Sequence, residues 1–474
     1  MPKYRDLLDE RRKPLSAIWF LAWPIMLEQV LIMLIHYVDT AMVGGLGPQA
    51  TAAVALTSPA NMLLNGIFAG VSIGFSVPVG RYIGSRNMDM AKRVIRQAVL
   101  SIGICGGAMT AVMLLLAPYI PVWMGGEPEI LADATSFISV LSFSYVFSMS
   151  VQICGSILRC TGDTRTPLVF NVSTNIINMA LNFLLIYPSR TVEVFGRSFS
   201  IAGAGLGVAG SALASVVALS FSGLMLLRAL FRENAVCRIA LKDGFRLDKV
   251  IWGDMLKLGM PVALERVTLS AGQVAMTAMA TALGTDSLAA HSLAITAESI
   301  TYMPSFGFAA AATTLVAQSL GAGKPRLARR FADYCTVGCV LFMSSMGFLL
   351  FFGGDMLISL FTPSAAVVAI GAAALRVEAL AQPLYAVSQI GTGILRGARQ
   401  TKLAFIVSLI GMWAVRIPTA YLMSRYAPEL GLTGLWIGMA SDLSVRGLLI
   451  LLLLRGGRWA GAEAPEPPAQ TQEA

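Results

Sequence analysis

Residues 24–47 read PIMLEQVLIMLIHYVDTAMVGGLG, and residues 261–284 read PVALERVTLSAGQVAMTAMATALG. The two stretches share the proline, the glutamate four positions later and the closing Leu-Gly, at an offset of 237 residues. The same register continues without a gap to the Ile-Leu-Arg sequence that ends at Arg159 and recurs at Arg396. A register of this length indicates that the chain contains two copies of one structural unit.

The composition places both copies in a membrane. Of the 474 residues, 56% are hydrophobic and only 13% are charged, whereas a soluble domain carries about 25% charged residues. Stretches such as AMTAVMLLLA at 108–117 are continuously apolar, which excludes the alternating strands of a membrane barrel. The apolar runs predict an all-α polytopic membrane protein with twelve transmembrane helices in two parallel six-helix repeats. The predicted spans start near residues 17, 52, 94, 131, 167, 201, 251, 288, 330, 366, 402 and 430.

The distribution of Lys and Arg predicts the orientation. These residues crowd the loops on one side of the predicted spans, whereas the opposite loops hold only Arg190, Arg197 and Arg425. By the positive-inside rule, both termini are expected in the cytoplasm, and the protein in the inner (plasma) membrane. The expected parts are a cytoplasmic segment 1–16, an N-terminal lobe 17–230, a cytoplasmic linker 231–250, a C-terminal lobe 251–455 and a disordered cytoplasmic tail 456–474.

Several classes of function are not expected. The net charge of +9 comes from Lys and Arg residues that gather on one predicted membrane face. Membrane orientation therefore accounts for the positive charge, and nucleic acid is not an expected partner. The six cysteines do not pair within a predicted outside loop, so a disulfide framework is not expected. The two histidines belong to no Cys/His group with metal spacing, so neither a metal site nor a metalloenzyme is expected. The charged N-terminal segment lacks the apolar core of a removable signal peptide.

Polar residues in the first half point to a cation site. An ionisable group inside a span costs at least about 2.5 kcal/mol, so each one needs a reason. Asp39 is expected in the outer half of the first span, at a depth similar to Asn178 and Asn182 on one face of the fifth. With the Ser215 hydroxyl they would offer hard oxygen ligands to a proton or a small cation. The alternative is that the asparagines are interhelical hydrogen-bonding groups and Asp39 a helix-end residue. Two more residues of the first span are candidates for supporting contacts: His36 and Glu28.

The second half carries more charge in its predicted spans. Its acids are candidates for coupling or substrate contact: Glu265, Glu298, Glu378 and Asp442. Four arginines balance them: Arg266, Arg376, Arg416 and Arg446. The equal numbers of acidic residues and arginines favour the alternative that these groups form buried ion pairs and neutralise one another.

Several motifs of the chain resemble those of the multidrug and toxic compound extrusion (MATE) family. The resemblance rests on Trp23-Pro24 through Val38-Asp39-Thr40 to Gly44-Gly45, and on VAQSLGAG at 316–323. It also rests on LRCTGDT at 158–164, which is similar to the family's LRGxGDT turn with Cys160 where Gly is usual. The resemblance spans nearly the whole chain.

The resemblance implies two six-helix lobes that export organic, often cationic, compounds in exchange for H⁺ or Na⁺ and need no cofactor. Asp39 matches the family's aspartate in span 1, Asn178 and Asn182 match its polar pair in span 5, and Ser215 stands where Thr is usual. The acids that some members carry in spans 7 and 10 are replaced here by Leu269 and Tyr385.

The expected function is therefore a secondary active multidrug exporter that works by alternating access, not an enzyme. Small organic substrates and the lipid bilayer are the expected partners, and a monomer is the expected state. The alternative is a lipid-linked oligosaccharide flippase of the same superfamily, which would use a strongly cationic central cavity.

Overall fold

The computed structural model describes residues 7–8, 13–194, 197–232, 237–240, 244 and 246–461. Within these ranges, the side chains of residues 35–37, 39–41, 190–194, 197–202 and 458 lie outside the description. Most of the predicted N-terminal segment and of the predicted tail also lie outside the described residues.

Among its described residues, the first half of the chain forms nine α-helices and a hairpin. They are α1 (Pro14–Gly44), α2 (Pro48–Gly84), α3 (Met88–Ser101), α4 (Gly107–Leu116), α5 (Ile120–Trp123), α6 (Pro128–Ser142), α7 (Tyr145–Cys160), α8 (Arg165–Leu185), β1 (Pro188–Val194), β2 (Arg197–Ala204) and α9 (Gly207–Leu230). A π-helical segment, Ile102–Gly106, joins α3 to α4, so that the two make one continuous span.

The second half forms eight further α-helices. They are α10 (Lys249–Ala282), α11 (Thr285–Tyr302), α12 (Ser305–Gly321), α13 (Pro325–Ser359), α14 (Ala365–Gly397), α15 (Thr401–Leu409), α16 (Ile417–Tyr426) and α17 (Leu432–Arg455). The π-helical segment Ile410–Arg416 joins α15 to α16, and short 3₁₀ turns lie at Pro428–Leu430 and Arg458–Gly461.

The predicted all-α polytopic membrane fold is confirmed. Among the described residues, nine helical segments are long and apolar enough to cross a membrane, or eleven when each of two bent helix pairs counts as one span. The span predicted near residue 251 is α10, which has 34 residues and is long enough to cross a bilayer at about 1.5 Å per residue. It is less apolar than the others because it carries charged side chains, among them Asp254 and Lys257.

The bends in two spans were not predicted from the sequence. The helices α6 and α7 meet at 47°, and α11 and α12 meet at 45°. In the second pair Pro304 lies at the break, and a proline favours a bend because it removes one backbone hydrogen bond and its ring crowds the preceding turn. In the first pair the Ser142 hydroxyl donates to the Ile138 carbonyl, a bond from side chain to preceding turn that favours bending.

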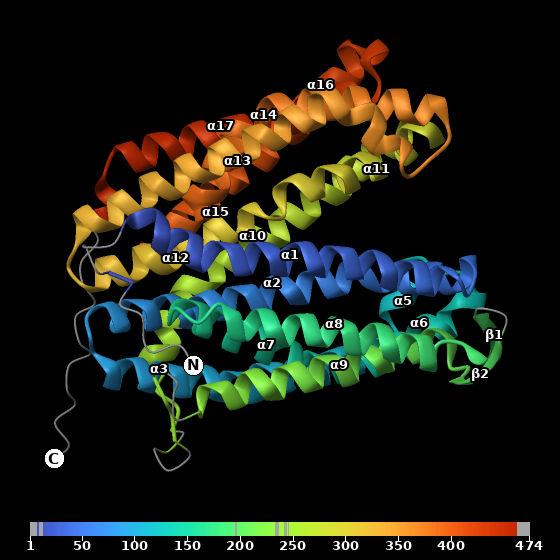
Figure 1. Cartoon of the computed structure of the whole chain (residues 1–474). Coiled ribbons are helices and arrows are strands. Elements are labelled where there is room, and N and C mark those ends of the chain that lie inside the picture. The colour runs from blue at the N-terminus through green and yellow to red at the C-terminus, as the bar shows by residue number, and fades with distance from the viewer. Residues whose placement is uncertain are drawn as a thin grey trace.

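The two halves of the chain lie side by side (Figure 1). Their ribbons approach one another at the left of the view and diverge towards the right, where β1 and β2 lie. The helix α2 packs against α10 and α12, and α1 packs against α8 of its own half and α12 of the other. Ile18 and Leu21 of α1 accordingly share a buried core with Phe308 and Leu315 of α12. Helix α1 therefore packs against helices of both halves.

The crossing of α2 and α12 is reciprocal. Each helix ends in a glycine, Gly84 and Gly321, that lies against the backbone of the other helix. The Arg81 guanidinium donates to the Ala398 carbonyl at 3.3 Å, and the Gln318 amide donates to the Cys160 carbonyl at 2.7 Å. Arg81 and Gln318 occupy equivalent positions in the repeat, as do the two glycines, so each half holds the other in the same way.

An antiparallel hairpin of β1 and β2, which was not predicted from the sequence, joins α8 to α9. Val194 pairs with Arg197 and Thr191 pairs with Ser200, with a register shift between Pro188 and Arg190. The segment is rich in β-branched and aromatic residues, which favour strands. It lies at the end of the molecule where the two halves diverge (Figure 1).

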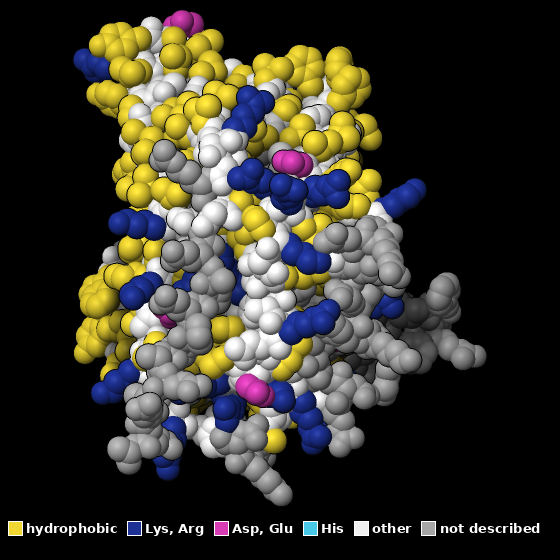
Figure 2. All heavy atoms as spheres, turned by 90° about the vertical axis from the view of Figure 1, so that its left-hand side faces the viewer, with side chains coloured by type: hydrophobic (Ala, Val, Ile, Leu, Met, Phe, Trp, Pro, Cys, Tyr) yellow, Lys and Arg dark blue, Asp and Glu magenta, His cyan; other side chains and the backbone are white. Residues whose placement is uncertain are grey.

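The opposite end carries the basic loops. Figure 2 views the molecule from the left-hand side of Figure 1 and shows many Lys and Arg side chains with few acidic ones. This end, hereafter the basic end, includes the starts of α3, α10, α13 and α15.

Candidate functional site

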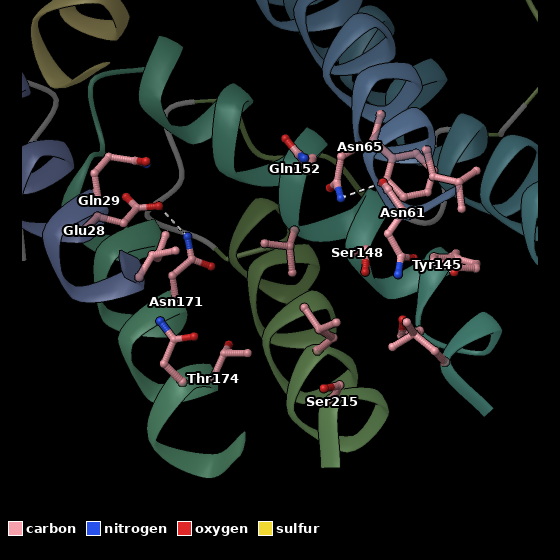
Figure 3. A pocket seen from close by; sticks show the side chains of 18 of the residues that line it. Glu28, Gln29, Asn61, Asn65, Tyr145, Ser148, Gln152, Asn171, Thr174 and Ser215 are labelled. Carbon is pink, nitrogen blue, oxygen red and sulfur yellow. Dashed lines mark hydrogen bonds between the residues drawn. The ribbon is translucent and has the colours of Figure 1, made fainter. Parts of the chain in front are cut away.

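A polar cavity of about 630 Å³ lies inside the first half. Helices α1, α2, α6, α7, α8 and α9 contribute its walls. Its lining is unusual for a membrane protein because it contains many carboxamide side chains: Gln29, Asn61, Asn65, Gln152, Asn171 and Asn175. Figure 3 shows that these side chains come from several helices and surround a common space. A cavity of this size fits a small organic molecule.

Glu28 is the acidic residue of this wall, and it is fixed by two neighbours. Its Oε1 accepts a hydrogen bond from the Asn171 amide at 2.5 Å and pairs with the Arg159 guanidinium at 3.3 Å. The Glu28 residue is 3% exposed. A buried carboxylate is stable only when it is paired and hydrogen-bonded. The contact between Glu28 and Asn171 is visible in Figure 3.

The second half contains the same arrangement at an offset of 237 residues. Glu265 pairs with Arg396 at 2.8 Å and accepts a hydrogen bond from the Ser408 hydroxyl at 2.9 Å. Glu28, Arg159 and Asn171 thus correspond to Glu265, Arg396 and Ser408, and we call each set of three a clamp. Each clamp joins the first span of its half to the fourth and fifth. The sequence predicted the repeat, but not that its retained glutamate and arginine contact each other.

The predicted cation site is brought together in part. The Asn178 amide donates to the Ser215 hydroxyl at 3.1 Å, and the Asn182 amide donates to the Asn178 carbonyl oxygen at 3.2 Å. Asn182 is buried, and Ser215 also lines the cavity. The three residues therefore form a polar chain that leads from α8 to the cavity wall on α9.

Two of the residues singled out from the sequence lie in a part of α1, residues 35–41, where most side chains lie outside the description. Asp39 and His36 lie in the second half of this helix, and their side chains lie outside the described residues. Since α1 packs against α8, its outer part runs beside the helix that carries Asn178 and Asn182. The role of Asp39 stays a prediction.

The acids of the second half fall into two groups. Asp442 accepts from Arg416 at 2.8 Å and is paired with Arg446, so it belongs to a closed, fully buried ion network. Glu378 is also fully buried, but neither of its carboxyl oxygens has a hydrogen-bonding partner in the described part of the chain. Glu298, 6% exposed, lies close enough to Glu378 to interact with it electrostatically.

Two further side chains of the second half, Arg376 and His291, have partners. Arg376 forms an ion pair with Asp355 at an exposed position, and the indole of Trp436 donates to His291 at 3.1 Å. Among the described residues, no three His, Cys, Asp or Glu side chains form a group that could hold a metal ion.

Sequence reasoning missed most of the cavity lining. Asn61, Asn65, Gln152 and Asn171 were not singled out, although amide side chains inside apolar spans are a signal that could have identified them. The missing information was which helix faces are adjacent.

Comparison with known proteins places the chain. The family model described as MatE matches residues 24–184 and 261–422, one match in each half. A probable multidrug resistance protein NorM of Thermotoga maritima is 29% identical over 459 residues, which cover 96% of this chain and 94% of that protein. A multidrug resistance protein NorM of Burkholderia vietnamiensis is 27% identical, with 91% of each chain covered.

Solved structures have the same fold. A structure described as the outward-facing conformation of a multidrug resistance MATE family transporter of the MOP superfamily aligns with a TM-score of 0.88 and 24% identity. The alignment covers 98% of this chain and 99% of that one. A MOP superfamily transporter from Pyrococcus furiosus aligns with a TM-score of 0.86 and 23% identity over 98% and 99% of the two chains. Since the family model matches more than half of the sequence, in the register of its internal repeat, this multi-pass membrane protein belongs to the MatE family.

Proposed function

We propose that the protein is a secondary active multidrug exporter that moves organic, often cationic, compounds out of the cell in exchange for H⁺ or Na⁺. The observation that carries this proposal is the cavity of about 630 Å³ in the first half, whose wall meets the chain from Asn182 through Asn178 to Ser215. The names of the similar NorM proteins support multidrug efflux.

The coupling mechanism follows from the position of α1. A charged carboxylate removed from water is costly, so binding of a cation at Asp39, with Asn178, Asn182 and Ser215 as further ligands, stabilises the site in its enclosed state. Helix α1 packs against α8 and also against α12. A change in how its outer part sits on α8 therefore alters the contact between the halves, and this is the requirement for alternating access. Glu28 supports the site by joining α1 to α7 and α8.

The second half offers two uncommitted acids. Glu265 and Asp442 are held in ion pairs, so they stabilise the helices of their lobe. Glu298 and Glu378 remain the groups in this half that could contact a substrate or a coupling ion. Arg376 pairs with Asp355, and Arg416 pairs with Asp442, which weighs against the strongly cationic cavity that the flippase alternative requires.

The basic end is proposed to face the cytoplasm. The Lys and Arg side chains at that end (Figure 2) agree with the positive-inside rule, and the hairpin end then faces outside. Both termini are placed in the cytoplasm, and the lobes 17–230 and 251–455 are the moving bodies joined by the linker 231–250. A monomer is proposed, because helices of one chain supply the described lining of the cavity.

Reconstituted protein tests the proposal directly. Efflux of a fluorescent organic cation from proteoliposomes is measured with a pH gradient alone and with a Na⁺ gradient alone. Transport that depends on one gradient names the coupling ion, and Asp39→Asn is expected to abolish it. Asp286→Asn is the matched control, because Asp286 is an exposed acid in the first turn of α11. Full efflux by well-folded Asp39→Asn protein would overturn the coupling site, and no transport with either gradient would overturn the antiport.

A further inference from the structure

A second pocket, of about 390 Å³, lies at the basic end, where the linker between the halves runs over α3 and enters α10. Its polar lining is dominated by cations: Arg93, Arg96, Arg246 and Lys249, with Gln97 and Asp248. The transport proposal uses none of these residues.

The walls of this pocket are held in place by one buried side chain, that of Gln97. Gln97 is 4% exposed. Its amide donates to the Arg246 carbonyl at 2.7 Å, and its Oε1 accepts from the Asp248 backbone at 3.1 Å and from the Trp252 indole at 3.0 Å. The linker and the first turn of α10 are thereby held against α3.

The charges in the pocket do not balance. Asp248 pairs with Arg93 at 2.8 Å, and its other oxygen caps α10 by accepting from the backbone of Val250 and Ile251. Its carboxylate is therefore fully engaged. In the described part of the chain, Arg246 and Lys249 are exposed and have no acidic partner. Among the described residues that line the pocket, four are cationic and one is acidic.

We propose that this pocket binds a phosphate group, supplied by the headgroup of an anionic phospholipid. Guanidinium groups recognise phosphate oxygens through two parallel hydrogen bonds, and a lysine adds a point charge. The pocket lies between the second and third turns of α3 and the first turn of α10 at the basic end, and basic pockets between membrane helices on one face of the bilayer meet lipid headgroups. A phosphate bound there joins Arg93 and Arg96 of α3 to Arg246 and Lys249, and so holds the linker in place.

The repeat provides an internal comparison. At the offset of 237 residues, Arg93 corresponds to Arg330, but Arg96 corresponds to Asp333 and Gln97 to Tyr334. The second half therefore keeps one cation of this face and replaces another with an acid. The phosphate site belongs to the first half alone, and the start of α13 serves as its control.

The test compares two double variants of the full chain with equal changes in charge. Arg246→Gln with Lys249→Gln alters the pocket, and Arg326→Gln with Arg330→Gln alters exposed residues at the start of α13. Binding of dioctanoyl phosphatidylglycerol to protein in a neutral detergent is measured by native mass spectrometry, with dioctanoyl phosphatidylcholine and inorganic phosphate as comparisons. Each cation removed from the pocket should weaken binding about fivefold, roughly 25-fold for the pair, whereas the α13 variant should change it less than twofold.

The outcomes separate the possible sources of the phosphate. Saturable binding of phosphatidylglycerol that inorganic phosphate does not displace supports the lipid headgroup. Equal displacement by inorganic phosphate supports the phosphate site but overturns the lipid source. Equal weakening in both variants, or no saturable binding by either ligand, overturns the site.

Hydrogen exchange on the wild-type protein provides a second measurement that needs no variant. Phosphatidylglycerol should slow backbone exchange at residues 246–252 and leave the start of α13 unchanged. Unchanged exchange at 246–252 under saturating lipid would overturn the proposal.

Discussion

The α2–α12 crossing predicts the effect of adding a single methyl group. A Cβ at Gly84 would lie 2.0 Å from the Gln318 carbonyl oxygen, and a Cβ at Gly321 would lie 2.0 Å from the Arg81 carbonyl oxygen. Carbon and carbonyl oxygen atoms ordinarily approach to about 3.3 Å. In Gly84→Ala the two helices must therefore separate by roughly 1.3 Å, and overpacking of this kind costs about 1–3 kcal/mol. This cost falls only on the arrangement in which the helices cross closely.

The population of that arrangement should fall by a factor of roughly 5 to 150. We expect folded Gly84→Ala protein to transport about 5- to 150-fold more slowly in the proteoliposome assay. Spin labels at Ser85→Cys and Lys324→Cys should show a larger fraction of long distances than in the otherwise unaltered protein. Both label positions are exposed at the basic end.

Gly253→Ala is the matched control, because a Cβ there has nothing within 4 Å. The Gly253→Ala variant gains the higher helix propensity of alanine over glycine, about 1 kcal/mol, but introduces no steric clash. The double variant Gly84→Ala with Gly321→Ala should cost about as much as one substitution, since a single separation relieves both contacts. Normal transport and an unchanged distance distribution in Gly84→Ala would refute the reasoning.

Three further predictions concern buried groups. Glu265→Gln should lower the free energy of unfolding by about 3–5 kcal/mol, because it leaves Arg396 without its acidic partner. Thermal unfolding in detergent measures this change. The control is Asp355→Asn, which removes the acid of an exposed ion pair, and a decrease in melting temperature no larger than that of the control would contradict the prediction. Asp442→Asn should be at least as destabilising, because it strands two buried arginines, and a wild-type melting temperature would contradict that. Burial raises the pKa of Cys237 to about 11, so N-ethylmaleimide at pH 8 should modify it roughly 100-fold more slowly than an ordinary cysteine of pKa about 8.5. Peptide mapping measures the rate, and equal rates in folded and denatured protein would contradict the prediction.

The sequence predicted the architecture well because hydrophobic length and repetition are local properties. Span positions follow from apolar runs, and the register from Pro24 to Thr164 established the duplication. The break at Pro304 and the β1–β2 hairpin were not predicted. A proline inside a span can also be tolerated, as Pro24 is within α1, so its presence alone does not decide between a bend and a continuous helix.

The site was predicted less completely because it depends on which helix faces meet. Asn178 and Asn182 could be grouped with Asp39 by depth and Ser215 added as a nearby hydroxyl, and the structure brings the two asparagines and the serine together. The partners of Glu28 could not be found in this way, since Arg159 lies 131 positions away. The repeat did hold a clue to this contact. A glutamate and an arginine that occur at the same spacing in both halves are candidates for an ion pair with each other.

The two clamps have acquired different surroundings since they were duplicated. In the second half, Ser408 and Glu265 are buried within the helices that they join. In the first half, Asn171 and Glu28 also form part of the cavity wall. A substitution that reshapes the cavity at these positions therefore also changes how firmly α1 is held to α8. In this half, therefore, the atoms that shape the cavity for a ligand are also atoms that hold the helices together.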